Sequence, residues 1–207
     1  MDQELIAKLR NRLAVARIAR PSLERFAPSH ARHHRFETAA PNSRHACVMV
    51  LLYPRAGHWH LPLVLRPQHF RHHRGQVALP GGAQDLGENL RETVLRELEE
   101  EIGVAASQVE LLGTLTPFFV PASGFTLHPW VGWSRATPLF RPSQNEVAEL
   151  IEAPLAPILD FSTFSSETRE VAGQGAEVPY FAIGRHKVWG ATCIVLGELA
   201  TLLAEVG

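Results

Sequence analysis

Residues 82 to 104 read GAQDLGENLRETVLRELEEEIGV, and this stretch combines a helical hydrophobic pattern with closely spaced carboxylates. Its apolar residues recur every four positions, at Leu90, Val94, Leu98 and Ile102, as on the buried side of an amphipathic helix. Gly103 follows directly and suits the left-handed conformation that ends many helices. The stretch therefore predicts a helix over 90–102 that packs on a core.

Three glutamates lie on one side of this predicted helix. At about 100° per residue, Glu97, Glu100 and Glu101 fall within an arc of roughly 100° beside the apolar stripe. Like charges this close repel one another unless a cation lies among them, and oxygen ligands suit Mg²⁺ or Mn²⁺ better than zinc. The spacing therefore favours a divalent metal site. The alternative for the glutamates alone is a solvated acidic helix.

Two glycines precede the helix, after Pro80. Gly81 and Gly82 allow the backbone to turn tightly and to bring its amides or carbonyls close to a phosphate or an ion. Gly81 is therefore a candidate substrate-binding residue, and Gly82 a candidate metal ligand.

The spacing of the whole stretch resembles the signature of the Nudix hydrolases. Gly82 is followed after five residues by Glu88, and after seven more by Arg96-Glu97-Leu98-x-Glu100-Glu101-x-Gly103-Val104. A match at every defined position of a long motif is specific. The resemblance implies an enzyme that cleaves diphosphates linked to another moiety, with Mg²⁺ or Mn²⁺ held on a loop–helix–loop.

The resemblance also implies a role for each charged residue of the signature. Glu97 and Glu101 would be the principal metal ligands, and Glu100 a further ligand or a group that positions water. Glu97 is alternatively the general base, a choice left open because coupled carboxylates titrate as a unit. Arg96 is expected to orient Glu97, the alternative being a surface ion pair with Glu100. Glu88 could cap amides or reach a metal through water.

The segment before the helix resembles a second signature, that of the coenzyme A pyrophosphatases within this family. It consists here of Arg66, Arg71 four residues later, Gly75 three residues after that, and the run Pro80-Gly81-Gly82. Arginines offer paired donors to phosphate oxygens, and coenzyme A carries a 3′-phosphate as well as a diphosphate. The resemblance assigns Arg66, Arg71 and Gly75 to substrate binding, the alternative being a basic surface hairpin.

Some positions depart from this second signature and others extend it. Val64, Pro67 and Leu79 replace the residues usual in the subfamily, which leaves the acyl or nucleotide preference open. Later segments keep the subfamily order as far as about Glu205. Among them, Glu146 is a candidate catalytic carboxylate on a loop, or a plain surface glutamate before a strand.

Apolar runs bounded by glycine or proline predict the remaining elements. Strands are expected at 46–53, 61–66, 76–79, 109–119 and 125–133, with a last hairpin at 178–183 and 187–189 and helices at 5–18 and 191–205. Proline-rich irregular structure is expected at 154–164. Helices on a mixed sheet give an α/β fold, an α/β/α sandwich, which agrees with the Nudix fold that the resemblance implies.

The predicted organisation is an N-terminal helical and His-rich extension, residues 1–44, followed by a Nudix domain, residues 45–207. The extension is expected to pack on the domain or to support a homodimer. At 207 residues and 45% hydrophobic content, the chain is long enough to bury a substantial core.

The net charge and the cysteine content bear on the binding partners and the cellular compartment of the protein. A formal net charge of −1 gives no reason to expect binding to nucleic acid or to a membrane surface. Cys47 and Cys193 are expected to be buried free thiols in a reducing compartment. No signal segment and no apolar run of about 20 residues is evident, so a cytoplasmic location is expected.

The sequence therefore predicts a metal-dependent Nudix pyrophosphohydrolase that cleaves the diphosphate of coenzyme A or acyl-CoA. One alternative is the same chemistry on another nucleoside diphosphate derivative, such as ADP-ribose or NADH. The other is a non-catalytic Nudix module that senses a nucleotide, which the retained carboxylates disfavour.

Overall fold

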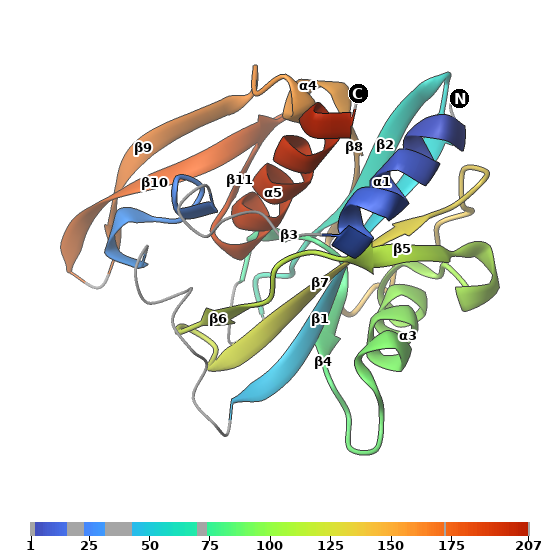
Figure 1. Cartoon of the computed structure of the whole chain (residues 1–207). Coiled ribbons are helices and arrows are strands. Elements are labelled where there is room, and N and C mark those ends of the chain that lie inside the picture. The colour runs from blue at the N-terminus through green and yellow to red at the C-terminus, as the bar shows by residue number, and fades with distance from the viewer. Residues whose placement is uncertain (1–2, 16–22, 32–42, 70–73, 172, 207) are drawn as a thin grey trace.

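The structure is a computed structural model that describes residues 3–15, 23–31, 43–69, 74–171 and 173–206 (Figure 1). Its main sheet consists of β1 Arg44–Arg55, β2 His58–Leu65, β3 Val77–Ala78, β4 Gly81–Ala83, β5 Glu110–Thr114, β6 Phe118–Val120, β7 Phe125–Trp133 and β8 Glu149–Pro154. Five strands run in the order β3-β2-β1-β7-β5, while β4, β6 and β8 pair with β1, β7 and β2. The sheet is mixed because β1 is parallel to β7 and antiparallel to β2 and β4.

Strand β1 is buried on both faces, which explains its nearly continuous apolar sequence. Met49 and Leu51 belong to the cluster under α3 Leu90–Ile102, whereas Val50 and Leu52 belong to the larger cluster under α5 Ala191–Val206. Figure 1 shows α3 on one side of the sheet and α5 on the other. The predicted α/β/α sandwich is confirmed.

Helix α1 Gln3–Val15 lies on the α5 side of the sheet and contacts β5 and α5. Its residues Ile6 and Leu9 are buried in the same cluster as the apolar face of α5. The helix was predicted at 5–18, and its last three predicted residues lie outside the described ranges.

A second sheet lies beside α5 and consists of β9 Phe164–Val171, β10 Gln174–Ile183 and β11 His186–Trp189, in the order β11-β10-β9 (Figure 1). The predicted last hairpin is confirmed as β10 and β11. Strand β9 was not predicted, because charged and hydroxyl side chains dominate its sequence and no apolar alternation marks it.

The prediction of one strand over 109–119 is wrong, because this segment forms β5 and β6 with a break between them. Both Thr116 N and Thr116 Oγ1 donate to the buried carboxylate of Glu198, and Pro117 has no amide hydrogen. The ladder to β7 therefore cannot continue through these residues. A short helix, α4 Ala156–Leu159, also lies within the segment expected to be irregular.

Two short 3₁₀ helices, η1 Ser29–Ala31 and η2 Ala106–Gln108, complete the elements. Within the described ranges, no helix has both the length and the hydrophobicity of a membrane span.

Candidate functional site

Local hydrogen bonds fix both ends of α3. Asn89 caps the first turn, since its Oδ1 accepts from the amides of Arg91 and Glu92 at 3.0 and 3.1 Å. The Glu92 carboxylate accepts in return from the Asn89 amide at 2.8 Å, which completes a capping box. Gly103 ends the helix at φ 72°, as predicted. The helix thus has the predicted bounds, 90–102.

The two glycines of β4 allow the backbone to pass very close to its neighbours. A Cβ on Gly81, whose φ is 150°, would lie 2.1 Å from the carbonyl oxygen of Cys47 on β1. A Cβ on Gly82 would lie 2.4 Å from the carboxyl carbon of Glu97 on α3. Any side chain at Gly82 would therefore displace the Glu97 carboxylate.

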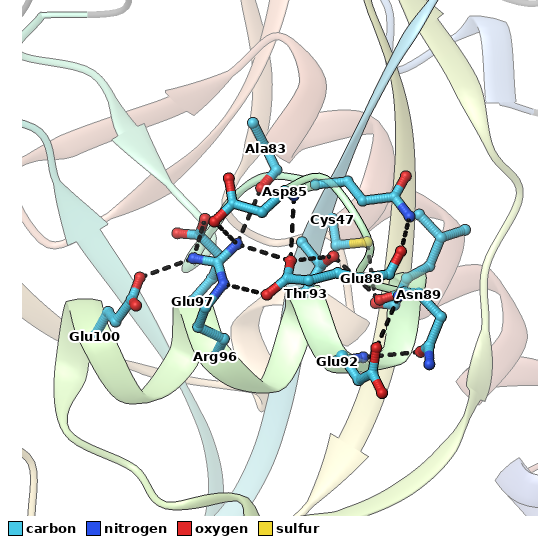
Figure 2. Close-up of polar contacts among 12 residues, drawn as sticks. Cys47, Ala83, Asp85, Glu88, Asn89, Glu92, Thr93, Arg96, Glu97 and Glu100 are labelled. Carbon is cyan, nitrogen blue, oxygen red and sulfur yellow. Dashed lines mark hydrogen bonds and ion pairs between the residues drawn. The ribbon is translucent and has the colours of Figure 1, made fainter.

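Arg96 lies at the centre of the acidic cluster and contacts three glutamates (Figure 2). Its Nε and Nη2 donate to the two carboxylate oxygens of Glu88 at 2.6 and 3.1 Å. Its Nη1 donates to Glu97 Oε1 at 2.9 Å and to Glu100 Oε2 at 2.8 Å. Arg96 thus makes the contacts that both of its predicted roles require, one with Glu97, which it would orient, and one with Glu100, as a surface ion pair.

Glu88 is the most extensively bonded carboxylate of the site. Besides Arg96, it accepts from the Thr93 hydroxyl at 2.9 Å and from the Asp85 amide at 3.2 Å. These hydrogen bonds, that of Arg96 foremost, lower the pKa of Glu88 to about 2. The Glu88–Arg96 pair was not predicted, because Glu88 lies on the loop before α3 and reaches Arg96 only through the way that this loop folds back along the helix.

Glu101 is the most buried acidic residue of α3, with 3% of its surface exposed. Its Oε2 accepts from the Gly81 amide at 2.9 Å, and its Oε1 lies 3.9 Å from Arg66 Nη1. Burial raises the pKa of Glu101 to about 7 despite these two favourable contacts. Burial also raises the pKa of Glu97. The structure thus brings Glu97, Glu101, Gly81 and Arg66 together.

Glu146 lies on the loop that connects β7 to β8 and is held near the end of α3. Two amides of this loop bond to carbonyls of the helix, Arg141 N to Ile102 O at 2.8 Å and Ser143 N to Glu101 O at 2.9 Å. The negative charge of Glu146 contributes to the raised pKa values of Glu97 and Glu101. The loop therefore places Glu146 within electrostatic range of both carboxylates.

Gly75 contributes to the turn between β2 and β3. At φ 64°, its amide donates to Arg66 O at 3.1 Å, and Arg66 N donates to Gln76 O at 3.0 Å. A Cβ at Gly75 would lie 2.3 Å from the side-chain nitrogen of Gln68. The contacts of Gly75 are those of a turn residue beside Arg66. Arg71, the other arginine of the predicted substrate site, lies outside the described residues.

A cleft of about 850 Å³ opens beside this site. Arg66, Gly81 and Gly82 line it on the side of the acidic cluster, and residues of β11 and α5 line it elsewhere. A second depression, of about 900 Å³, lies along β5 and the end of β7. The three glutamates predicted as metal ligands line neither hollow, but the first is lined by Gly81 and Arg66, which both contact Glu101. The first cleft is therefore the candidate substrate site.

The arrangement of the carboxylates differs from a ready-made metal site. Within the part of the chain that the structure describes, no three His, Cys, Asp or Glu side chains converge as a metal-binding group. Glu97 and Glu100 instead turn toward Arg96, which supplies the cation that the crowded carboxylates require. The side chain of Glu100 is also 54% exposed, far from the burial of Glu101.

The donor set nevertheless fits a hard divalent cation. Glu97, Glu100 and Glu101 offer oxygen donors, which Mg²⁺ and Mn²⁺ prefer. The raised pKa values of Glu97 and Glu101 show that neighbouring donors compensate only part of the burial of their charges. A cation bound between them would supply the missing compensation.

Comparisons with known proteins agree with the Nudix signature at the family level. The NUDIX domain family matches residues 43–163. Proteins named "Uncharacterized Nudix hydrolase NudL" are 37% identical in Yersinia enterocolitica, over 77% of this chain and 81% of the relative, and 32% identical in Photorhabdus laumondii, over 77% and 84%. A third, from Pectobacterium atrosepticum, is 36% identical over 61% of this chain, and the match spans 66% of its length.

One solved structure supports the fold. It is a MutT/nudix family protein from Enterococcus faecalis, which is 18% identical with a TM-score of 0.53, over 89% of this chain and 73% of that one. At this identity the likeness concerns the fold alone.

Proposed function

The chain belongs to the Nudix hydrolase family, and on this basis we propose that it is a metal-dependent pyrophosphohydrolase that cleaves the diphosphate of coenzyme A or acyl-CoA. The products would be 3′,5′-ADP and 4′-phosphopantetheine or its acyl derivative. Water would be the nucleophile.

The contact between Arg66 and Glu101 carries the proposal. Arg66 comes from the segment that resembles coenzyme A pyrophosphatases, and Glu101 comes from the Nudix signature. Their side chains are 3.9 Å apart, and Arg66 also lines the cleft beside the acidic cluster. A guanidinium in this position can bind the oxygens of a diphosphate that lies against the carboxylates.

We assign the metal to Mg²⁺ or Mn²⁺. Glu97 and Glu101 would hold it, with Glu100 and the backbone of Gly82 as further oxygen donors. A bound divalent cation neutralises charge on the diphosphate and lowers the pKa of water.

The chain's own residues prepare the site for this reaction. Arg96 fixes one oxygen of Glu97, and the Gly81 amide fixes one oxygen of Glu101. One of the carboxylates near the reacting water, Glu97 or the loop residue Glu146, would accept its proton. Arg66 would bind a phosphate oxygen and hold the diphosphate next to the carboxylates of Glu97 and Glu101.

The proposal includes the cellular compartment of the enzyme. We place it in the cytoplasm, where the buried thiols of Cys47 and Cys193 would stay reduced. Burial raises the pKa of the Cys47 thiol to about 12, so it would be unreactive in the folded protein.

Parallel assays on several diphosphates test the proposal. Purified protein is incubated with coenzyme A, acetyl-CoA, ADP-ribose or NADH, with Mg²⁺, with Mn²⁺ and with a chelator, and the products are separated by ion-pair chromatography. We expect 3′,5′-ADP from the first two substrates, only with metal. Cleavage of ADP-ribose or NADH alone would favour another nucleoside diphosphate derivative as substrate. Absence of turnover on all four would favour a nucleotide-sensing module.

A further inference from the structure

The amino end of α5 forms part of the wall of the cleft. Gly190, Ala191 and Thr192 line it, followed one turn later by Val195. Helix α5 has 16 residues, and in its first turn the amide of Ile194 donates to the carbonyl oxygen of Gly190 at 3.2 Å. The first turn of any helix leaves amides without intrahelical acceptors and carries partial positive charge. This wall therefore favours an anion.

Thr192 is an independent indication of a ligand at this wall. The residue is only 8% exposed, it lines the cleft, and its hydroxyl has no hydrogen-bond partner among the described residues. Its oxygen is not among the fully buried side-chain atoms that lack a partner, so the hydroxyl is accessible from the cleft. It is thus available to donate to a molecule bound there.

The same cleft carries positive charge away from the acidic cluster. Arg44 lines it, with its guanidinium 4.2 Å from the centroid of the Phe125 ring, and its side chain is exposed. None of the ion pairs within the described part of the chain involves Arg44. The cleft therefore offers cationic and amide donors at positions other than Arg66.

This wall also lies outside the residues that the NUDIX family matches. The NUDIX family match ends at residue 163, whereas α5 and β11 come after it. Elements outside a shared catalytic domain are suitable places for contacts with the part of a substrate that does not react.

We propose that the amino end of α5, with the hydroxyl of Thr192, binds a phosphate monoester of the substrate that is separate from the cleaved diphosphate. Among the substrates considered above, coenzyme A and its thioesters carry such a group, at the ribose 3′ position, whereas ADP-ribose and NADH do not. The inference rests on the proposed function. It adds that the site recognises coenzyme A by its 3′-phosphate.

Turnover of coenzyme A and 3′-dephospho-coenzyme A tests the inference. The full chain is expected to have a kcat/KM at least about tenfold higher for coenzyme A, as for one hydrogen bond to a charged group. Thr192→Val, which keeps the shape of the side chain, should lower this ratio about tenfold, whereas Thr192→Ser should preserve it. Thr201→Val is the matched control on the same helix, because the Thr201 hydroxyl bonds to Gly197 O outside the cleft, and it should leave the ratio unchanged. Equal kcat/KM values for both substrates would overturn the inference while the proposed function stands.

Binding without turnover separates the two proposals. By calorimetry, 3′,5′-ADP should bind the full chain about tenfold more tightly than 5′-AMP, and Thr192→Val should remove the difference. If neither coenzyme A substrate is cleaved but this difference is found, the proposed function fails and the phosphate site stands. Equal binding of both nucleotides would overturn the site. If inorganic phosphate added to 5′-AMP reproduces the tighter binding, the site takes free phosphate, and its assignment to the substrate is overturned.

Discussion

Arg96 and Glu88 form a two-point ion pair, in which Nε and Nη2 of the guanidinium donate to the two oxygens of the carboxylate at 2.6 and 3.1 Å (Figure 2). The pair connects the loop before α3 to its second turn. It also fixes the guanidinium, whose remaining nitrogen Nη1 then reaches Glu97 and Glu100.

Replacing Arg96 by lysine should therefore impair catalysis more than folding. An ammonium group cannot donate in parallel to Glu88 and also hold Glu97. We expect kcat to fall by roughly tenfold to a hundredfold, on the scale of a misplaced catalytic group, with little change in the circular dichroism spectrum. Arg91→Lys, at an exposed position in the first turn of the same helix, is the control and should retain full activity. A wild-type kcat for Arg96→Lys would show that the guanidinium geometry is dispensable.

Glu97→Gln should lower kcat by at least ~10²-fold, the scale expected for loss of a general base. The amide keeps the size of the side chain beside Gly82 but cannot bind a cation or accept a proton equally well. Glu99→Gln, which makes the same chemical change on the exposed side of the helix, should leave kcat unchanged. Near wild-type turnover by the Glu97 variant would remove this residue from the mechanism.

The pH dependence of stability should reflect the burial of Glu101. The pKa of Glu101 is about 7 in the folded protein and 4.5 in the unfolded chain, so the folded protein binds this proton more tightly. The resulting contribution to the free energy of unfolding is fully present below pH 4.5 and is lost as the pH rises through 7. At ~1.4 kcal/mol per pKa unit, this is on the order of 3 kcal/mol. Glu97 acts in the same direction, whereas Glu88, with its lowered pKa, loses its contribution only below pH 4.5.

Thermal unfolding of the metal-free protein measures this effect. The melting temperature should be higher at pH 5 than at pH 8, and Glu101→Gln, which retains an acceptor for the Gly81 amide, should reduce the difference. Addition of Mg²⁺ should raise the melting temperature of the wild-type protein mainly at pH 8. An identical pH dependence in the wild-type protein and the variant would contradict the assignment to Glu101.

Glu198→Ala should destabilise the fold. The carboxylate is 1% exposed and accepts from the amide and the hydroxyl of Thr116, with distances of 2.7 to 3.1 Å. Its loss would leave buried donors unsatisfied, at a cost of about 2–4 kcal/mol. Glu205→Ala is the control, because this exposed residue of the same helix only pairs with Arg12 at the surface, a pair worth about 0–1 kcal/mol. Equal midpoints of urea unfolding for the two variants would show that the hydrogen bonds between Glu198 and Thr116 do not stabilise the fold.

The parts of the fold that the sequence predicted are those governed by local pattern. Helix α3 has the predicted bounds because its apolar spacing and Gly103 both act within a few residues. Strand β7 has the predicted bounds, 125–133, for the same reason. The identity of the acidic cluster also followed from spacing, since three of its members lie within five residues of one another.

Long-range contacts account for what was missed. The break between β5 and β6 depends on Glu198, which is 82 residues from Thr116 in the sequence. Strand β9 is held by backbone pairing to β10 and by an ion pair between its Glu167 and Lys187 of β11. These contacts leave no apolar pattern in the sequence of β9. The cleft wall formed by Thr192 likewise depends on how α5 packs against the sheet, which no local motif specifies.

Product analysis after incubation with coenzyme A and a divalent metal tests the proposed function most directly. We expect release of 3′,5′-ADP in Mg²⁺ or Mn²⁺, none in chelator, and at least a ~10²-fold slower release by Glu97→Gln. Cleavage of ADP-ribose or NADH with coenzyme A left intact would contradict the proposed function, and would show that Arg66 and the amino end of α5 serve another diphosphate.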